Sequence, residues 1–129
     1  MACTMKRTLP AFILVLLIAG CATGPVQPKT FNATLEVDFG PANKPPVRRV
    51  IRVEQGVTPE GLVSKTFAVE RGAICCDKRE TAAIDGVVAN PAANRWWSVS
   101  VNGSKDVSPF KTRLKPGDLV RWEYRQNEQ

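Results

Sequence analysis

The chain has no histidine among its 129 residues. Serine or cysteine nucleophiles activated by histidine therefore cannot be built, and the usual general base near neutral pH is missing. The 12 acidic residues are spread singly along the chain, and no pair of them is marked as sharing a cleft for glycan cleavage. A phosphate-binding glycine loop is missing too, because the run Gly86-Val87-Val88 does not have that pattern. We expect a protein that is not an enzyme and that needs no cofactor.

Long apolar runs are scarce as well. Only one occurs, at residues 9–19, after the basic Lys6-Arg7 pair. It is shorter than the roughly 20 residues of a membrane span and has the length of the apolar part of a secretory signal peptide. The segment that ends in Ala19-Gly20-Cys21 resembles the bacterial lipobox, in which the cysteine is lipidated and becomes the first mature residue. We expect a signal peptide at residues 1–20; the alternative is an ordinary cleaved signal with an incidental cysteine.

The resemblance to lipoproteins implies a covalent lipid on Cys21, with a diacylglycerol and an acylated (palmitate-type) amino terminus, which is enough for stable membrane anchoring. Ala22 follows the cysteine where an aspartate would favour retention in an inner membrane. In a Gram-negative host this implies the periplasmic face of the outer membrane. Residues 21–29 are rich in proline and glycine, and we expect them to form a lipidated tether that separates the folded domain from the membrane.

The charge is mildly basic. The formal net charge is +6 at pH 7, and two of the positive charges, Lys6 and Arg7, lie in the leader. A positive surface can attract anionic partners, but these charges are scattered and the protein is expected to be exported. We therefore do not expect nucleic acid as a partner. The partners that remain are the membrane, through the lipid anchor, and a small molecule, a glycan or an envelope protein.

Two segments near the start of the mature chain alternate apolar and polar residues. The pattern is clearest at residues 30–39 and returns at residues 47–53, after a loop rich in glycine, proline and asparagine. Together they predict a hairpin with a long loop.

Three arginines lie on the second of these strands: Arg48, Arg49 and Arg52. They could bind an anion. Glu36 and Asp38 on the first strand are available as cross-strand partners, and we favour this ion-paired arrangement.

A short helix is predicted to start at Thr58-Pro59-Glu60. Threonine can cap a helix, proline suits the first helical position, and glutamate favours the positive helix end. We expect two to three turns that end before Gly72. Irregular structure should follow from residue 73, and then a strand near residues 82–88 in which Asp85-Gly86 introduces a bend.

The last third of the chain holds all three tryptophans and the single tyrosine. Residues 95–101 and 119–124 alternate in polarity and flank turn sequences, so they predict two strands of one sheet. Five residues are expected in the core: Trp97, Val99, Val101, Trp122 and Tyr124.

This order of elements predicts an α+β fold: a small β-grasp-like domain at residues 30–126, with a mixed sheet and one short helix. The segments AIDGV (83–87), RWWSVSVNG (95–103) and LKPGDLVRWEY (114–124) resemble the transcobalamin C-terminal-like domain, which is related to the soluble-ligand-binding β-grasp group. In the cobalamin carriers of that family, the module closes over a corrinoid held by a separate helical domain. Because the sequence shows no helical domain, the resemblance implies a small binding module and not a particular ligand.

Alternation places Trp96, Ser98 and Ser100 on the strand face opposite Trp97. A tryptophan beside small hydroxyl residues can form a platform for a sugar ring or for a side chain of a partner. The alternative is that residues 90–94 cover Trp96. We predict that these three residues line a ligand or partner face.

Cys75 and Cys76 are the only thiols left once the leader is removed and Cys21 is lipidated. Adjacent Cα atoms lie about 3.8 Å apart, less than the roughly 4.4–6.8 Å usual in disulfides, so a bond between the two would be strained. The alternatives are such a disulfide, disulfide bridges between molecules, free thiols, and a redox or metal-capturing pair. Zinc would need further ligands, and histidine cannot supply them.

Two functions follow from these observations. The first is a lipid-anchored, non-catalytic binding module for a small molecule or glycan. The second is an accessory lipoprotein that docks another envelope protein through an exposed sheet edge or through the Trp96 face. A concave pocket would favour the first, and a flat patch or an unpaired edge strand would favour the second.

Overall fold

The computed structural model describes residue 24, residues 29–72 and residues 80–127. Its elements, in chain order, are β1 (Thr30–Asp38), η1 (Gly40–Ala42), β2 (Val47–Glu54), α1 (Pro59–Ser64), β3 (Val69–Gly72), β4 (Glu80–Ile84), β5 (Val87–Val88), η2 (Pro91–Ala93), β6 (Arg95–Val101) and β7 (Leu119–Gln126). The predicted signal peptide, Cys21, most of the tether and the Cys75-Cys76 pair lie outside the described residues. Within those residues, no helix is both long and apolar enough to span a membrane.

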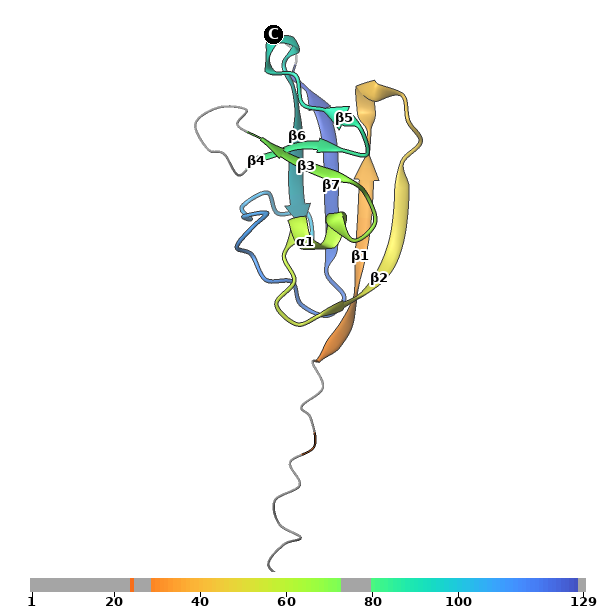
Figure 1. The fold of residues 1–129 in the computed structure, drawn as a ribbon, viewed down its shortest axis with the longest axis vertical. Helices are drawn as coiled ribbons and strands as arrows, with labels where there is room; N and C mark the ends of the chain where they lie inside the picture. The colour runs from red at the N-terminus through yellow and green to blue at the C-terminus, as the bar shows by residue number, and fades with distance from the viewer. Residues whose placement is uncertain (1–23, 25–28, 73–79, 128–129) are drawn as a thin grey trace, which may run out of the picture.

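Four long strands form the main sheet in the order β2-β1-β7-β6. β1 runs antiparallel to β2 and parallel to β7, and β6 runs antiparallel to β7. The predicted mixed sheet with one short helix is therefore confirmed, and the four strands stand side by side in Figure 1. Leu35 lies opposite Val120 across the parallel pair, and Val37 lies opposite Trp122. Both pairs belong to the buried core.

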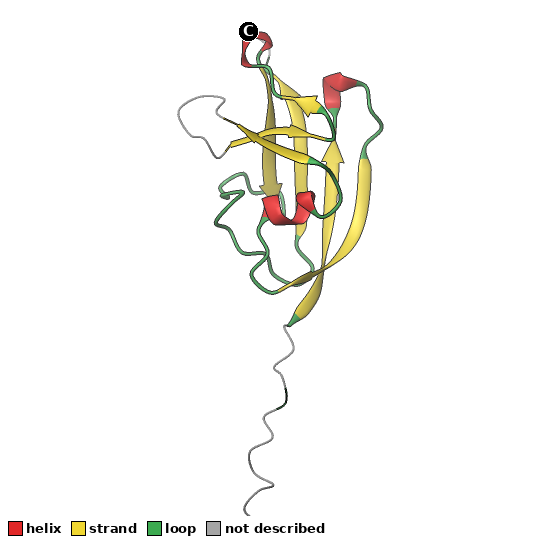
Figure 2. Ribbon diagram, viewed as in Figure 1, coloured by secondary structure: helices red, strands yellow, loops and turns green. Residues whose placement is uncertain are grey.

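A second sheet, in the order β3-β4-β5, crosses the long strands, and α1 lies beside it (Figure 2). Three aromatic side chains of the main sheet hydrogen bond to these covering elements. Trp97 Nε1 donates to the carbonyl of Val87 at 2.9 Å, and the Tyr124 hydroxyl donates to the carbonyl of Val88 at 2.8 Å. Trp122 Nε1 donates to the carbonyl of Pro59, the first residue of α1, at 3.3 Å. The small sheet and the helix therefore cover the same face of the main sheet.

The core lies between these two layers. Its largest fully buried side chains include Trp122, Phe39, Leu35, Leu62 and Ile84. The Phe39 ring meets the Trp97 ring edge to face, with centroids 5.7 Å apart. Trp97 and Val99 pack against the core, and Val101, Trp122 and Tyr124 are buried, so the predicted core residues of the last two strands are confirmed.

The helix is shorter than predicted. It starts where expected, and the Thr58 hydroxyl caps it by accepting a hydrogen bond from the Gly61 amide at 3.1 Å. It ends at Ser64, however, and β3 begins at Val69, where the prediction continued the helix towards Gly72. Weak helix propensity after Ser64 explains the early end, because this segment gains more from pairing with β4 than from another helical turn.

The strand predicted near residues 82–88 is a hairpin. β4 and β5 pair antiparallel across Asp85-Gly86, whose φ values are 51° and 77°. Positive φ at both central residues is the geometry of the tight hairpin turn that Asp-Gly favours. The predicted bend is therefore a complete reversal of the chain.

Candidate functional site

A pocket of about 530 Å³ opens along the outer edge of β6. β4 contributes Glu80 and Thr81 to its wall, and β6 contributes four successive residues, 96 to 99. The loop between β6 and β7 adds Lys105 and Phe110, among others, and the buried Trp122 also lines the pocket. Its volume falls within the roughly 300–1,000 Å³ typical of small-molecule sites, and its lining combines aromatic surface with a few polar groups, as such sites do.

Thr81 is a residue of the pocket wall whose hydroxyl group is buried. The residue is only 8% exposed, and among the described residues its hydroxyl has no hydrogen-bond partner. Burying a hydroxyl without a partner costs free energy, commonly about 1–3 kcal/mol. The oxygen itself is inaccessible to solvent, so this cost belongs to the folded protein and not to the open space of the pocket.

The three residues of the predicted binding face lie on β6 in the predicted alternation. Trp96 lies opposite Arg125, Ser98 opposite Glu123 and Ser100 opposite Arg121. All three are half-buried.

The pocket brings together two of these three residues. Trp96 and Ser98 line it, whereas Ser100 is outside the set of residues that form its wall. That Trp96 and Ser98 bind a ligand stays a prediction.

Sequence reasoning missed Thr81, Lys105 and Phe110. They come from β4 and from a loop without periodicity, and they join β6 only through the tertiary fold. Phe110 gave one usable signal: it is an aromatic residue directly after a proline in a polar loop.

The loop that carries Phe110 is fastened to the covering layer. The amide of Glu60 donates to the carbonyl of Pro109 at 3.0 Å. The guanidinium of Arg71 lies 5.2 Å from the centroid of the Phe110 ring and forms an ion pair with the buried Glu60, with an Nη2 to Oε1 distance of 2.6 Å. Helix α1 and strand β3 therefore hold this wall of the pocket in place, which limits the ordering that binding would require.

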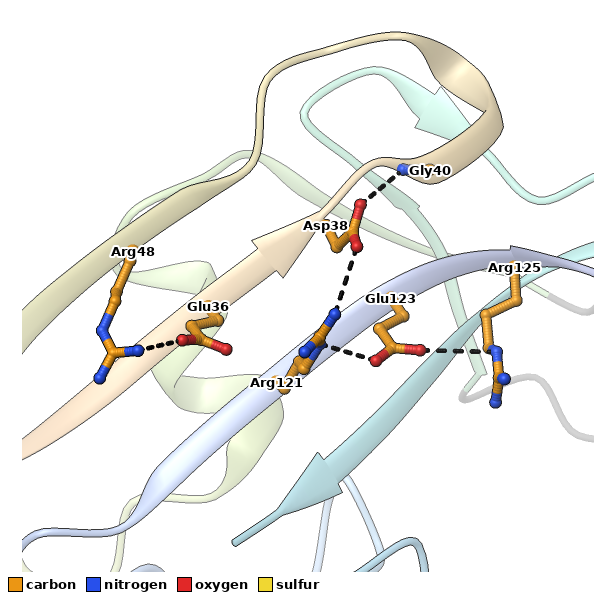
Figure 3. Close-up of polar contacts among 7 residues, drawn as sticks. All are labelled: Glu36, Asp38, Gly40, Arg48, Arg121, Glu123 and Arg125. Carbon is orange, nitrogen blue, oxygen red and sulfur yellow. Dashed lines mark hydrogen bonds and ion pairs between the residues drawn. The ribbon is translucent and has the colours of Figure 1, made fainter. Parts of the chain in front are cut away.

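The outer face of the main sheet, on which Trp96 and Ser98 also lie, carries an ion-pair network (Figure 3). Arg121 lies 3.3 Å from Asp38 and 2.6 Å from Glu123, and Arg125 lies 3.5 Å from the same glutamate. Arg48 pairs with Glu36 across β1 and β2, as predicted.

Two details of that prediction are wrong. Asp38 pairs with β7 and not with β2, because β7 lies on its other side. Arg49 lies opposite Leu35, on the other face of the sheet from Arg48. A hollow of about 310 Å³ is present on the outer face, but the acidic groups in its lining, Glu36 and Asp38, are already paired. The β6 pocket is therefore the better candidate.

The described part of the chain holds no group of three or more histidine, cysteine, aspartate or glutamate residues that could bind a metal ion. The pocket wall holds one carboxylate and one ammonium group, Glu80 and Lys105. Its chemistry is therefore that of stacking and hydrogen bonding around a nearly neutral centre.

No known family and no curated protein matches the chain. Solved structures do match it. One is a candidate metal-binding protein from Ruminococcus gnavus ATCC 29149, with 17% identity over 76% of this chain and 99% of that chain, at a TM-score of 0.53. Another is haptocorrin in complex with Cbi, with 14% identity over 76% of this chain, at a TM-score of 0.57.

This chain covers only 26% of haptocorrin, so the likeness is to one part of that protein. At these identities the matches show the fold alone. They support a transcobalamin-like fold, as the resemblance of the C-terminal motifs predicted, and the fold is that of a small α+β domain built mostly of strands.

Proposed function

We propose that this protein is a lipid-anchored, non-catalytic binding module of the bacterial envelope, which takes a small molecule or a glycan into the β6 pocket. The pocket itself is the observation that carries the proposal, because its volume and its aromatic lining with a few polar groups are those of a small-molecule site.

The pocket wall supports a binding role in two further ways. Trp96 and Phe110 offer aromatic surface on which a flat or ring-shaped ligand can stack. Glu80 is the single carboxylate of the described lining, whereas glycoside hydrolysis usually requires two.

The structural neighbours suggest compounds for a ligand screen. Haptocorrin was solved in complex with Cbi, and the Ruminococcus gnavus protein is described as a candidate metal-binding protein. A corrinoid therefore belongs in a ligand screen beside glycans and peptidoglycan fragments.

The test is a thermal-shift and tryptophan-fluorescence screen of the purified full-length protein in detergent. The compounds are a corrinoid, simple glycans and soluble peptidoglycan fragments. A ligand that binds only the folded state must raise the unfolding midpoint. We expect a saturable shift that Trp96→Ala abolishes.

Ser100→Ala is the matched control, because Ser100 lies on the same face of β6 but outside the pocket wall. It should bind the same compound as well as the unchanged protein does. A shift that survives Trp96→Ala undiminished would place the ligand elsewhere, and no shift with any compound would count against the proposal.

Docking of an envelope protein is the second candidate. β2 is the other edge strand of the main sheet, and its Val50 is 68% exposed. The same strand also carries Arg48, Arg49 and Arg52, and charged residues on an edge strand are a common protection against pairing with another chain. The β2 edge therefore favours docking less than the pocket favours a small ligand.

A further inference from the structure

The outer edge of β6 lines the pocket, and each end of this edge is already hydrogen bonded to another segment of the chain. At one end, Arg95 and Asn90 exchange two backbone hydrogen bonds of 2.8 and 3.0 Å. At the other end, Val101 and Ser104 exchange two of 2.9 and 3.0 Å. In an antiparallel ladder, alternate residues turn both their N–H and their C=O to the same side. Since Arg95 and Val101 use theirs on the side away from β7, the residues midway between them face that side too.

Those residues are Trp97 and Val99, and both line the pocket. In the described chain, the outward N–H and C=O groups of these two residues have no backbone hydrogen-bond partner. The pocket therefore presents two donors and two acceptors in a row, and two residues of strand separate the pairs by about 7 Å.

We propose that the pocket binds a short extended peptide, which adds a strand to the outer edge of β6 and pairs with Trp97 and Val99. This inference rests on the proposed function, because it takes the pocket as the binding site and names the class of ligand. A donor and an acceptor on every second residue is the pattern that another extended chain presents, and strand addition is a common mode of peptide recognition.

The closed ends set the length of the peptide. Asn90 and Ser104 already occupy the neighbouring strand position beyond each end of the free edge. Five strand positions lie between them, opposite residues 96 to 100, and three peptide residues occupy the middle three of these, opposite Trp97, Ser98 and Val99. The first and third exchange hydrogen bonds with Trp97 and Val99, and the second turns its N–H and C=O away.

The wall of the pocket sets the preferred chemistry of the peptide. Residues directly opposite each other in an antiparallel pair share a face, so the middle residue lies beside Ser98 and the aromatic surface of Trp96. Glu80 and Lys105 give the wall one charge of each sign. This balance matches a neutral or zwitterionic peptide better than one of high net charge.

The first experiment varies the peptide. The probe is acetyl-Val-Ser-Val-amide, titrated into the full-length protein in detergent and followed by tryptophan fluorescence. Three variants carry one N-methyl group each, on the first, second or third residue. Methylation of the first or the third residue removes an N–H that pairs with β6. We therefore expect each of these two peptides to bind about fivefold or more weakly than the unmethylated probe. Methylation of the middle residue is the matched control and should change the affinity less than twofold.

The second experiment varies the protein. Val99→Pro removes the outward N–H without touching the ladder to β7, and proline is tolerated on edge strands. Val99→Thr keeps the N–H and nearly the same shape. We expect the proline variant to bind the unmethylated probe at least about fivefold more weakly, and the threonine variant to bind it within about twofold. Thermal unfolding of both variants checks that they fold. If the proline variant does not fold, the methylated peptides alone test whether the peptide pairs with the strand edge.

The outcomes separate this inference from the proposed function. Equal binding of all three methylated peptides overturns strand addition. Binding of a glycan or a corrinoid that depends on Trp96, with no binding of the peptide, overturns the peptide inference and leaves the proposed function standing. No binding by any of these compounds overturns both.

Discussion

Two threonines differ in the hydrogen bonding of their hydroxyl groups, and this difference should be measurable in the stability of the protein. The hydroxyl of Thr58 caps α1, whereas the hydroxyl of Thr81 has no partner among the described residues. Replacement by valine keeps the shape of either side chain and removes its polar group. The same chemical change should therefore have opposite effects at the two positions.

Thr81→Val should raise the free energy of unfolding of the unliganded protein by about 1–2 kcal/mol, because an unpaired buried hydroxyl is removed. Thr58→Val should lower the free energy of unfolding by about 0.5–2 kcal/mol through loss of the helix cap. Urea denaturation of both variants, followed by tryptophan fluorescence, measures these changes. A Thr81→Val variant that loses stability would mean that the hydroxyl is already satisfied.

Two ion pairs differ in burial and should differ in energy. Glu60 has a side chain that is 8% exposed, and Arg71 pairs with it, whereas the pair of Arg48 with Glu36 lies on the solvent face of the sheet. Arg71→Ala leaves a buried carboxylate without its partner, so we expect a loss of about 1.5–3 kcal/mol. Arg48→Ala, the control, should cost less than about 1 kcal/mol. Chemical denaturation of the two variants distinguishes them, and equal losses would contradict this account.

At the scale of elements, the turn after β1 is confined by the last strand. Gly40 has a φ of 41°, and a Cβ atom added there would lie 2.4 Å from the carbonyl oxygen of Tyr124. This oxygen belongs to the backbone of β7 and cannot move without disturbing the sheet. Gly86 also has a positive φ, 77°, but a Cβ atom there would meet nothing within 4 Å.

Gly40→Ala should therefore lower the free energy of unfolding by more than about 2 kcal/mol, because backbone strain and a steric clash add together. Gly86→Ala carries only the strain, about 1–2 kcal/mol. Thermal and urea unfolding of the two variants compare them directly. If both cost the same, the contact between the first turn and β7 does not constrain the structure.

The elements differ in how far sequence reasoning could reach. Residues 95–101 were predicted as a strand and form β6 with the same bounds, and β7 extends the predicted 119–124 by two residues. The predicted alternation, with Trp96 and Trp97 on opposite faces of the strand, is confirmed by the register with β7. These predictions succeeded because side-chain alternation and turn preferences act over a few residues.

Other elements depend on distant partners. β3 has four residues and weak periodicity, and it forms because β4 pairs with it. The sequence alone favoured a longer helix there, since the start signals at Thr58-Pro59-Glu60 are strong and no stop signal comes before Gly72. A short strand of this kind cannot be found from local preference.

For the whole molecule, we expect a lipid anchor to decide where the pocket works. Cys21 is the predicted attachment point of the lipid. We expect a cell that makes the full-length protein to incorporate labelled palmitate into it, and Cys21→Ser to abolish both the label and the membrane fraction of the protein. Cys3→Ser is the control and should change neither. Equal labelling of the Cys21→Ser variant would remove the lipid anchor from the proposed function.

The sequence by itself determined the elements whose signals are local: the hairpin of β1 and β2, the start of α1, and the strands β6 and β7 with their alternating faces. It also placed Trp96 and Ser98 on one face. Only the tertiary structure decided that β6 is an edge strand, that Thr81 and Phe110 lie beside it, and that the outward groups of Trp97 and Val99 open into a pocket. The reason is physical. Periodicity and turn geometry are properties of neighbouring residues, whereas a pocket is defined by the packing of segments that are far apart in the chain.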